Sequence, residues 1–272
     1  MLLVSAILVS TATYAWFSMN TSVTAKNMQV TAVSEGGIVI GAYTYSQNQW
    51  VAPANTAFKN EVEAAFPGKS GETLLRKALV PTSTTKIDKW YHATSNDVDN
   101  YAAASAYTNI DFVADNSTSY YLYNKFQIKS LEDSGNDSSI ARNLYVSAVT
   151  VTGNTNSTVL NNSLRVAVRV NGNSTFFFAP VYTSITDGSK LYQYGVSGDG
   201  TTPTRNSAAY DDGKLVIGAT PSKVIASAIG TTTPTEIEIF VYYEGEDVNC
   251  KSINAVNIDN LNVAVSFSTV GA

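Results

Sequence analysis

Apolar side chains recur at every second position along much of this chain, and this alternation constrains the fold more than any other feature. The stretches EIEIFVYY (236–243) and NVAVSFS (262–268) both alternate in this way. In an extended strand, side chains two positions apart point to the same side, so each stretch predicts a half-buried β-strand. LRVAVRV (164–170) and YLYNKFQIKS (121–130) give the same prediction, with Arg165 and Arg169 on the outward face.

Turn-forming residues divide the chain into many such strands. Segments rich in Gly, Asn, Asp and Ser, such as SGNDSS and TGNTNST, separate further predicted strands over residues 24–33, 37–45, 144–151, 175–182 and 214–217. The stretch VNGNS predicts a tight hairpin, because Asn171 and Gly172 both tolerate the positive φ that such a turn requires. Helical patterns are confined to residues 58–66 and 70–79.

Many strands and few helices predict an all-β fold. We expect an antiparallel two-sheet sandwich of jelly-roll type, with one or two short helices and an N-terminal apolar segment. Along the chain this gives the apolar segment over residues 1–17, an N-terminal strand over residues 18–35 and the sandwich over residues 36–272. Residues 86–116 are polar and poorly periodic, so they are expected to form a surface loop inserted in the sandwich.

Charge and cysteine content exclude several classes of protein. Charged residues make up 14% of the chain and the net charge is -5, so an anionic nucleic acid would be repelled. Cys250 is the one cysteine, which rules out an internal disulfide, and we expect it to be a small, unreactive buried thiol. His92 is the sole histidine, and with no His or Cys near it in sequence it is expected to be an exposed loop residue.

The sequence contains no recognisable catalytic motif. It lacks a phosphate-binding glycine loop, a nucleophile elbow and a zinc-helix pattern. Asp199, Asp211 and Asp212 are weak candidate calcium ligands, and no segment follows the spaced pattern of a dedicated calcium loop. The sequence therefore predicts a protein that is not an enzyme and that has no cofactor, calcium being the single ion left open.

The first 17 residues hold no charged side chain. Their apolar run ends in small residues, as in a secretory signal peptide, and cleavage is expected after Ala12 or Ala15, beside Trp16 and Phe17. The run is shorter than the roughly 20 residues that a membrane-spanning helix needs. Export is therefore predicted, with contact to the membrane during export or anchoring. A second interpretation stays open, in which residues 1–17 are retained as a helix in the core of a pilin-like filament.

Two stretches of the chain resemble a known family. The junction ATYAWFSMN, continuing to Ala32, resembles the N-terminus of the TasA and camelysin-like secreted fibre and surface proteins of Gram-positive bacteria. The C-terminal stretch is similar to the closing strands of related clostridial surface proteins, with Glu244, Gly245, Asp247 and Cys250 at the positions of an E-G-x-D-x-x-C turn. The resemblance covers about a fifth of the chain, at its two ends, and implies a jelly-roll subunit of a matrix or fibre.

The stretch that follows the apolar segment predicts how copies of the chain associate. Its candidate assembly residues are Val23, Ala25, Met28, Val30 and Ala32. A strand of this kind can pair with an open sheet edge of a neighbouring copy, and head-to-tail repetition of that contact builds a filament. The alternative is that the stretch is the first strand of its own sheet.

These observations together predict the structural subunit of an extracellular filament, located at the cell surface and bound to copies of itself. Host or matrix surfaces are further candidate partners. A different class also fits the residues: a monomeric surface adhesin or glycan-binding module, in which exposed aromatic rings contact sugars. Trp50, Trp90 and Tyr91 are the residues expected to bind in that case.

Overall fold

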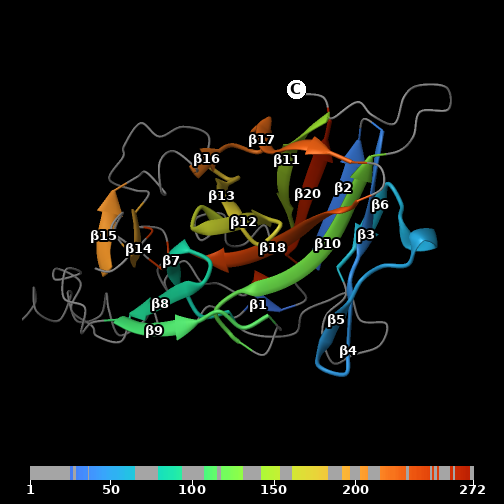
Figure 1. Cartoon of the computed structure of the whole chain (residues 1–272). Helices are drawn as coiled ribbons and strands as arrows, with labels where there is room; N and C mark the ends of the chain where they lie inside the picture. The colour runs from blue at the N-terminus through green and yellow to red at the C-terminus, as the bar shows by residue number, and fades with distance from the viewer. Residues whose placement is uncertain are drawn as a thin grey trace, which may run out of the picture.

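The computed structural model of this protein consists almost entirely of β-strands (Figure 1). It describes residues 25–26, 29–35, 37–64, 79–93, 107–114, 118–130, 142–153, 161–182, 192–196, 203–207, 215–230, 233–245, 247, 250, 258–259 and 261–269. The all-β, mainly antiparallel fold predicted from the alternation is confirmed.

Two large sheets form the body of the protein. In spatial order, the six-stranded sheet contains β16 (Leu215–Ile217), β13 (Ser174–Ala179), β12 (Leu164–Val170), β18 (Thr235–Tyr243), β10 (Leu122–Ser130) and β3 (Ile38–Ala42). The five-stranded sheet contains β17 (Lys223–Ile229), β11 (Arg142–Thr152), β20 (Asn262–Ser268), β2 (Gln29–Glu35) and β6 (Glu61–Glu63). Within these sheets, β13 pairs with β16 and β2 pairs with β20 in parallel, and the other neighbours are antiparallel.

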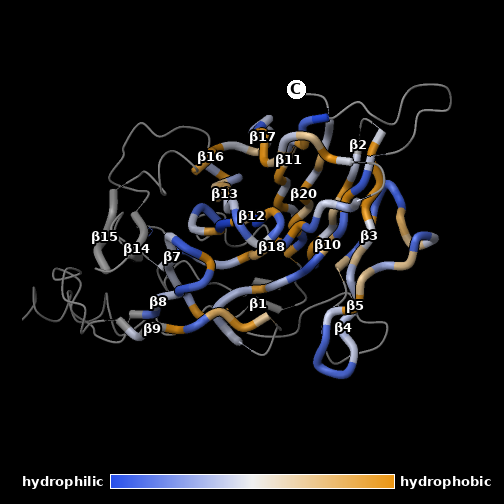
Figure 2. Tube along the Cα trace, viewed as in Figure 1, coloured by the Kyte–Doolittle hydropathy of each residue, from blue (hydrophilic) through white to orange (hydrophobic). Residues whose placement is uncertain are grey.

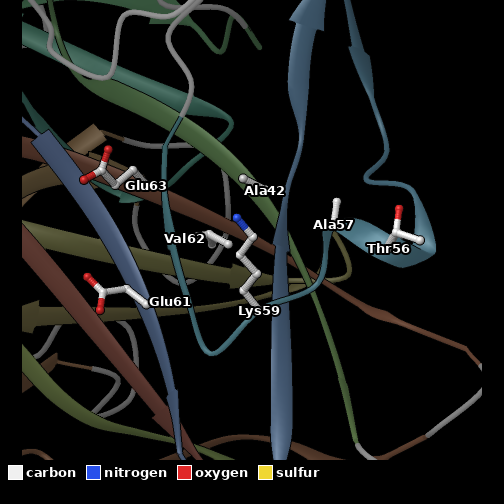
Figure 3. Close-up of a pocket in the computed structure, with 7 residues that line it drawn as sticks. All are labelled: Ala42, Thr56, Ala57, Lys59, Glu61, Val62 and Glu63. Carbon is white, nitrogen blue, oxygen red and sulfur yellow. The ribbon is translucent and has the colours of Figure 1, made fainter.

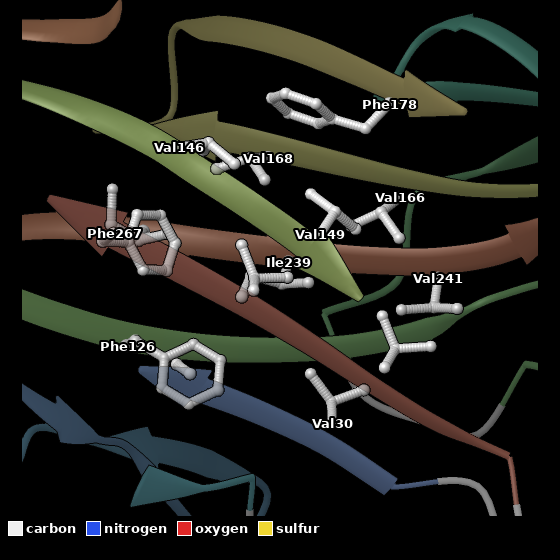
Figure 4. Packing of buried hydrophobic residues seen from close by; sticks show 14 of the residues in the cluster. Val30, Phe126, Val146, Val149, Val166, Val168, Phe178, Ile239, Val241 and Phe267 are labelled. Carbon is white, nitrogen blue, oxygen red and sulfur yellow. The ribbon is translucent and has the colours of Figure 1, made fainter. Parts of the chain in front are cut away.

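The main core fills the space between the two sheets (Figure 4). Val166 and Val168 of β12 and Ile239 of β18 enter it from the six-stranded sheet. Val149 of β11 and Phe267 of β20 enter it from the five-stranded sheet. All five are fully buried, and each such side chain contributes roughly 1.5–3 kcal/mol by leaving water. The period of two in the sequence therefore identifies the face of each strand that is buried in this core. Hydrophobic residues recur along these strands (Figure 2).

A third layer covers the other face of the six-stranded sheet. It is a small sheet of β7 (Ser83–Lys86), β8 (Lys89–Ala93) and β9 (Tyr107–Asp111). Between this layer and the large sheet lies a second core, rich in aromatic rings, formed by Ile87, Trp90, Tyr121, Tyr123, Ala167, Phe177, Phe240 and Tyr242. The expectation of a surface loop over residues 86–116 is corrected, because β8 and β9 lie within it and its Trp90 is fully buried.

Short elements complete the described chain. They are the pairs β1 (Ala25–Lys26) with β19 (Ile258–Asp259), β4 (Thr44–Ser46) with β5 (Gln49–Val51) and β14 (Tyr192–Val196) with β15 (Pro203–Ser207), and the 3-10 helix η1 (Asn55–Ala57). The predicted hairpin is confirmed: Asn171 and Gly172 join β12 to β13 with φ of 49° and 68°. The Asn171 side chain also accepts a hydrogen bond from the Glu236 N–H at 2.9 Å, which fixes the turn to β18.

The helix predicted over residues 58–66 is wrong for residues 58–64. Lys59 forms a β-bridge with Ile40 of β3, and β6 then pairs with β2. This segment thus passes from the edge of one large sheet to the edge of the other. Pairing with two sheet edges outweighs the weak helical preference of its Glu and Ala residues. Residues 65–66 and nearly all of the second predicted helix, residues 70–79, lie outside the described residues.

Candidate assembly site

The predicted assembly strand lies inside a sheet of its own chain. β2 sits between β20 and β6, and the Val30 and Ala32 side chains are fully buried in the main core. This is the alternative that the sequence left open, a first strand paired with its own sheet. Ala25 belongs to β1, whose side chains are not described, and Val23 and Met28 lie outside the described residues.

The pairing of β2 continues the pairing of β1. Ala25 is the partner of Ile258 in the first pair of strands, and Gln29 to Glu35 are the partners of Asn262 to Ser268 in the second. Both pairs are parallel and have the same offset in residue number. The Gln29 N–H also donates to the Leu261 carbonyl at 2.8 Å. Residues 25–35 therefore follow residues 258–268 in a single register, apart from the undescribed positions within them.

Only two residues connect this strand to the opposite sheet. β2 ends at Glu35 in the five-stranded sheet and β3 begins at Ile38 in the six-stranded sheet, so Gly36 and Gly37 make the crossing. Gly37 has a φ of +80°, which residues with a side chain rarely adopt. A Cβ atom at Gly37 would also lie 3.4 Å from an Arg142 nitrogen. The connection is thus short and depends on glycine.

The outer strands of the two large sheets are poor templates for an added strand. β16 and β6 have three residues each, and β3 is bridged by Lys59. β17 is longer, but its pairing with β11 shifts register twice and Ala228 within it has a φ of 59°. Short and irregular edge strands discourage pairing with another chain. Addition of a strand to an intact sheet is therefore disfavoured.

The turn that contains Glu244, Gly245, Asp247 and Cys250 connects the third layer to the end of β18 through backbone hydrogen bonds. Glu244 forms a parallel bridge with Thr82, whose N–H donates to the Tyr243 carbonyl at 3.0 Å. The Gly245 N–H returns a bond to the Thr82 carbonyl at 2.9 Å. The Asp247 N–H then donates to Glu244 and the Cys250 N–H to Asp247, at 3.1 and 2.8 Å, so two turns follow each other.

Cys250 is buried, as predicted. It is 1% exposed and forms no disulfide. Burial raises the pKa of its thiol well above the ordinary value, so the reactive thiolate is strongly disfavoured.

Asp247 of the turn forms a buried ion pair with Arg165. The Arg165 Nη2 donates to Asp247 Oδ2 at 2.5 Å, and both side chains are 0% exposed. Arg165 Nη1 donates to the Asn162 and Leu164 carbonyls, at 2.7 and 3.0 Å. The Tyr182 hydroxyl donates to the same carboxylate at 3.0 Å. The alternation of β12 predicts Arg165 on the outward face of the sheet, and it lies there, but it is buried because further chain covers that face.

A second ion pair lies on the same face of β12. Arg169 donates through Nε and Nη2 to both oxygens of Glu238, at 2.6 and 3.0 Å, and through Nη1 to Asp88 at 2.9 Å. The Tyr123 hydroxyl donates to Glu238 at 2.6 Å. Asp88 belongs to the turn between β7 and β8, so the ion pair links the third layer to the large sheet. The signal that reveals this burial is the row of aromatic residues on the outward faces of the neighbouring strands β10 and β18.

A partly buried polar network follows towards the edge strand β3. The Tyr43 hydroxyl donates to Glu236 at 3.0 Å and accepts from Gln127 at 2.9 Å. Lys125 completes it with an ion pair to Glu236 at 2.9 Å. Burial, followed by the hydrogen bond to Glu236, raises the pKa of Tyr43 to about 12. The network therefore favours the neutral form of the Tyr43 side chain.

The residues predicted to bind glycans are placed differently from one another. Trp90 is 0% exposed, stacked on Tyr121 at 4.4 Å between ring centres, and Tyr91 is 5% exposed. These two rings are buried in the third layer and have no face available to a sugar. Trp50 is the one of the three that is half-buried. His92, expected in an exposed loop, instead lies half-buried on β8, with Nδ1 3.0 Å from the Pro81 carbonyl oxygen.

The remaining candidates lie outside the described residues. They are the calcium candidates Asp199, Asp211 and Asp212 and the signal junction residues Ala12, Ala15, Trp16 and Phe17. Among the residues that are described, no three His, Cys, Asp or Glu side chains gather as metal ligands would. In the same part of the chain, no helix has the length and hydrophobicity needed to cross a membrane.

An open hollow of about 770 Å³ lies at the corner where the chain passes between the sheets. Figure 3 shows Lys59 in the middle of it, with Thr56 and Ala57 on one side and Glu61 and Glu63 on the other. The hollow is lined by charged groups of both signs that are exposed to solvent. Such an open, charged surface is unlike the enclosed, mainly apolar pockets that hold small molecules.

Comparison with known proteins finds no relative of this chain. No model of a protein family, no curated protein and no solved structure matches this chain.

Proposed function

We propose that this chain is an exported, non-enzymatic subunit of an extracellular protein filament, and that copies assemble head-to-tail by exchanging the strand β2. In the exchanged form, β2 of one copy occupies the place between β20 and β6 of the next. The resemblance of the two chain ends to TasA and camelysin-like proteins supports the same class of function. We further propose that the sandwich is of jelly-roll type and that the filament lies at the cell surface.

The observation that carries this proposal is the position of β2 within its sheet. The strand supplies two buried side chains, Val30 and Ala32, and pairs along its whole length with β20. A body without β2 would have an open β20 edge and a gap in its core. Any β2 strand of identical sequence fills that gap with the same contacts, so exchange conserves nearly all of the interaction free energy.

The connection between β2 and β3 favours exchange of β2 between copies over pairing of β2 within its own chain. Short connections invite strand swapping, because the strand can swing outward when the connection straightens. Here the connection is Gly36 and Gly37, which impose little steric restriction on such a change. Because each copy gives its strand to one neighbour and receives one from another, the contact does not close and a filament grows.

A pair of cysteines placed across β2 and β20 tests the exchange. Val33 and Ser266 are direct partners on the outward face, both half-buried. In a Val33→Cys, Ser266→Cys variant with Cys250→Ala, mild oxidation joins the two strands wherever they pair. After alkylation of free thiols, a non-reducing denaturing gel of assembled material should show a ladder of covalent multimers. Unassembled chains should give a crosslinked monomer.

The matched control moves one cysteine out of register. In Val33→Cys, Asn262→Cys the second position lies four residues from the partner of the first, or about 13 Å along the strand, too far for a disulfide. This control variant should give neither the ladder of multimers nor the crosslinked monomer. If assembled material yields crosslinked monomers and no ladder, β2 stays in its own chain within the filament, and the proposed exchange is wrong.

Retention of residues 1–17 in a pilin-like filament is a separate question from exchange. Mass spectrometry of the native N-terminus answers it. A chain that begins between residues 13 and 18 excludes a retained helix, and a chain that begins at Met1 excludes cleavage.

A further inference from the structure

The hairpin of β4 and β5 carries a fixed pair of aromatic rings. The turn between the strands is tight, since Gln47 and Asn48 have φ of 50° and 60°. Tyr45 and Trp50 are direct partners across the hairpin, with ring centres 5.2 Å apart and ring planes at 64°. Both rings are half-buried, so each presents part of its surface to solvent. The hairpin extends away from the two large sheets (Figure 1).

Trp50 is held in place by the body of the protein. Its indole Nε1 donates a hydrogen bond to the Ala114 carbonyl, beyond the end of β9. Its ring also meets Tyr123 of β10 edge to face, at 5.4 Å and 85°. A ring fixed by three neighbours loses little conformational entropy when a ligand packs on it. An isolated two-stranded hairpin has little stability of its own, but these contacts hold the Trp50 ring against the body of the protein. The site is therefore preorganised.

The chain segment that carries the ring pair is uncharged and largely polar. From Tyr43 to Phe58 the chain contains no Asp, Glu, Lys or Arg. The side-chain amides of Gln47 and Asn48 are exposed at the tip of the hairpin, beside the rings, which makes the tip hydrophilic (Figure 2). Amides donate and accept hydrogen bonds without carrying charge. Aromatic surface next to uncharged donors and acceptors is suited to a ligand that has apolar C–H faces and many hydroxyl groups.

We propose that the Tyr45 and Trp50 ring pair, with the amides of Gln47 and Asn48, binds a neutral polysaccharide. The C–H face of a hexose ring packs on the exposed aromatic surface, and the tip amides hydrogen-bond to its hydroxyl groups. The uncharged stretch from Tyr43 to Phe58 favours neutral chains over acidic ones, because it offers no cation to pair with a carboxylate or sulfate. This site would attach the chain to a carbohydrate surface whether or not the chain forms filaments.

The other side of the hairpin supplies a matched control. Val51 is 49% exposed and, by the alternation of the strand, points away from the Trp50 side. A Val51→Ala variant removes exposed apolar surface without touching the ring pair. Tyr45→Ala removes one ring and leaves the hydrogen bond and ring contact that anchor Trp50. Trp50→Ala removes the second ring, and circular dichroism checks that each variant stays folded.

The experiment titrates the full chain with cellohexaose, with maltohexaose and, as the acidic comparison, with a hexamer of galacturonic acid. Isothermal titration calorimetry measures binding, so the readout does not depend on the Trp50 ring that Trp50→Ala removes. We expect saturable binding of at least one neutral hexamer. Tyr45→Ala and Trp50→Ala should each weaken it roughly tenfold or more, which corresponds to about 1.4 kcal/mol, and Val51→Ala should bind like the native chain.

Three results would overturn the proposal. The first is the absence of saturable binding to both neutral hexamers. The second is equal weakening by Val51→Ala and Tyr45→Ala, which would indicate a nonspecific apolar contact. The third is loss of self-association in Tyr45→Ala and Trp50→Ala with no change in sugar binding, measured by analytical ultracentrifugation, which would make a second copy of the chain the occupant of the hairpin.

Discussion

The buried ion pair of Arg165 and Asp247 gives the sharpest test of how the closing turn is held. In Asp247→Asn the side chain keeps its size, but the buried Arg165 guanidinium loses the carboxylate that lies 2.5 Å from its Nη2. At about 4 Å, two charges attract by roughly 1 kcal/mol in water and about 4 kcal/mol at the effective dielectric of a protein. Both side chains here are 0% exposed, so the second value applies. We expect Asp247→Asn to lower the free energy of unfolding by about 3–5 kcal/mol.

The assay is urea unfolding of the native chain, followed by the fluorescence of the buried Trp90, with a surface pair as the control. Lys89 and Asp111 lie at 2.7 Å, close to the distance in the buried pair, but their side chains are 45% and 81% exposed. Asp111→Asn should therefore leave the free energy of unfolding nearly unchanged. Arg165→Met combined with Asp247→Asn should cost less than the sum of the two single changes, because the ion pair between them is lost only once. Equal costs for Asp247→Asn and Asp111→Asn would refute the reasoning.

Three further predictions concern the second core, the edge network and the loop after β5. Trp90→Ala removes the central ring of the aromatic core and should cost about 3–5 kcal/mol in urea unfolding; a cost below about 1 kcal/mol would mean that the third layer is not packed on the sheet. Because the pKa of Tyr43 is raised from 10.0 to about 12, the unfolded chain releases this proton at lower pH than the fold does, so stability present below pH 10 is lost as pH rises towards 12. Tyr43→Phe should lose less stability across that window in thermal melts, and an unchanged pH dependence would contradict the assignment. Gly41→Ala places a Cβ 2.7 Å from Pro53 Cγ and 2.8 Å from Pro53 Cβ and should destabilise the fold by about 1–3 kcal/mol; in a Pro53→Gly background, which lacks both atoms, Gly41→Ala should cost less in thermal melts, and an equal cost would show that the clash with Pro53 is not the cause.

The strands of the main core could be predicted because their signal is local. A period of two identifies the buried face of β10, β12, β18 and β20 without knowledge of any partner, and Asn171 with Gly172 determines a turn through backbone geometry alone. The failed helix over residues 58–66 has a different origin. Its EVE stretch fits both a strand and a helix, and the choice depends on the edges of β2 and β3, which come from elsewhere in the chain.

The third layer and the pairing partners of β2 escaped prediction because they depend on contacts between distant residues. β8 and β9 are five residues each, too short for a convincing period, and they become strands by covering a face of the large sheet. The outward Tyr121, Tyr123, Phe240 and Tyr242 were visible in the sequence as apolar residues on a face expected to meet water, and they are the signal for a covering layer. The parallel pairing of β2 with β20 has no local signal at all.

The pairing of β2 with β20 joins residues about 230 positions apart, and this has a consequence for synthesis. A ribosome adds roughly 5–20 residues per second, so β2 exists for about 10–50 s before its partner strand in the same molecule has been made. If the chain is exported N-terminus first, β2 also crosses the membrane before β20 of its own molecule, and a β20 strand that it meets during that delay belongs to a neighbour that has already crossed. Crowding at the site of production, rather than equilibrium among finished molecules, would then decide how many chains join one another. Dilute refolding of a purified chain removes those neighbours and should yield the self-paired form.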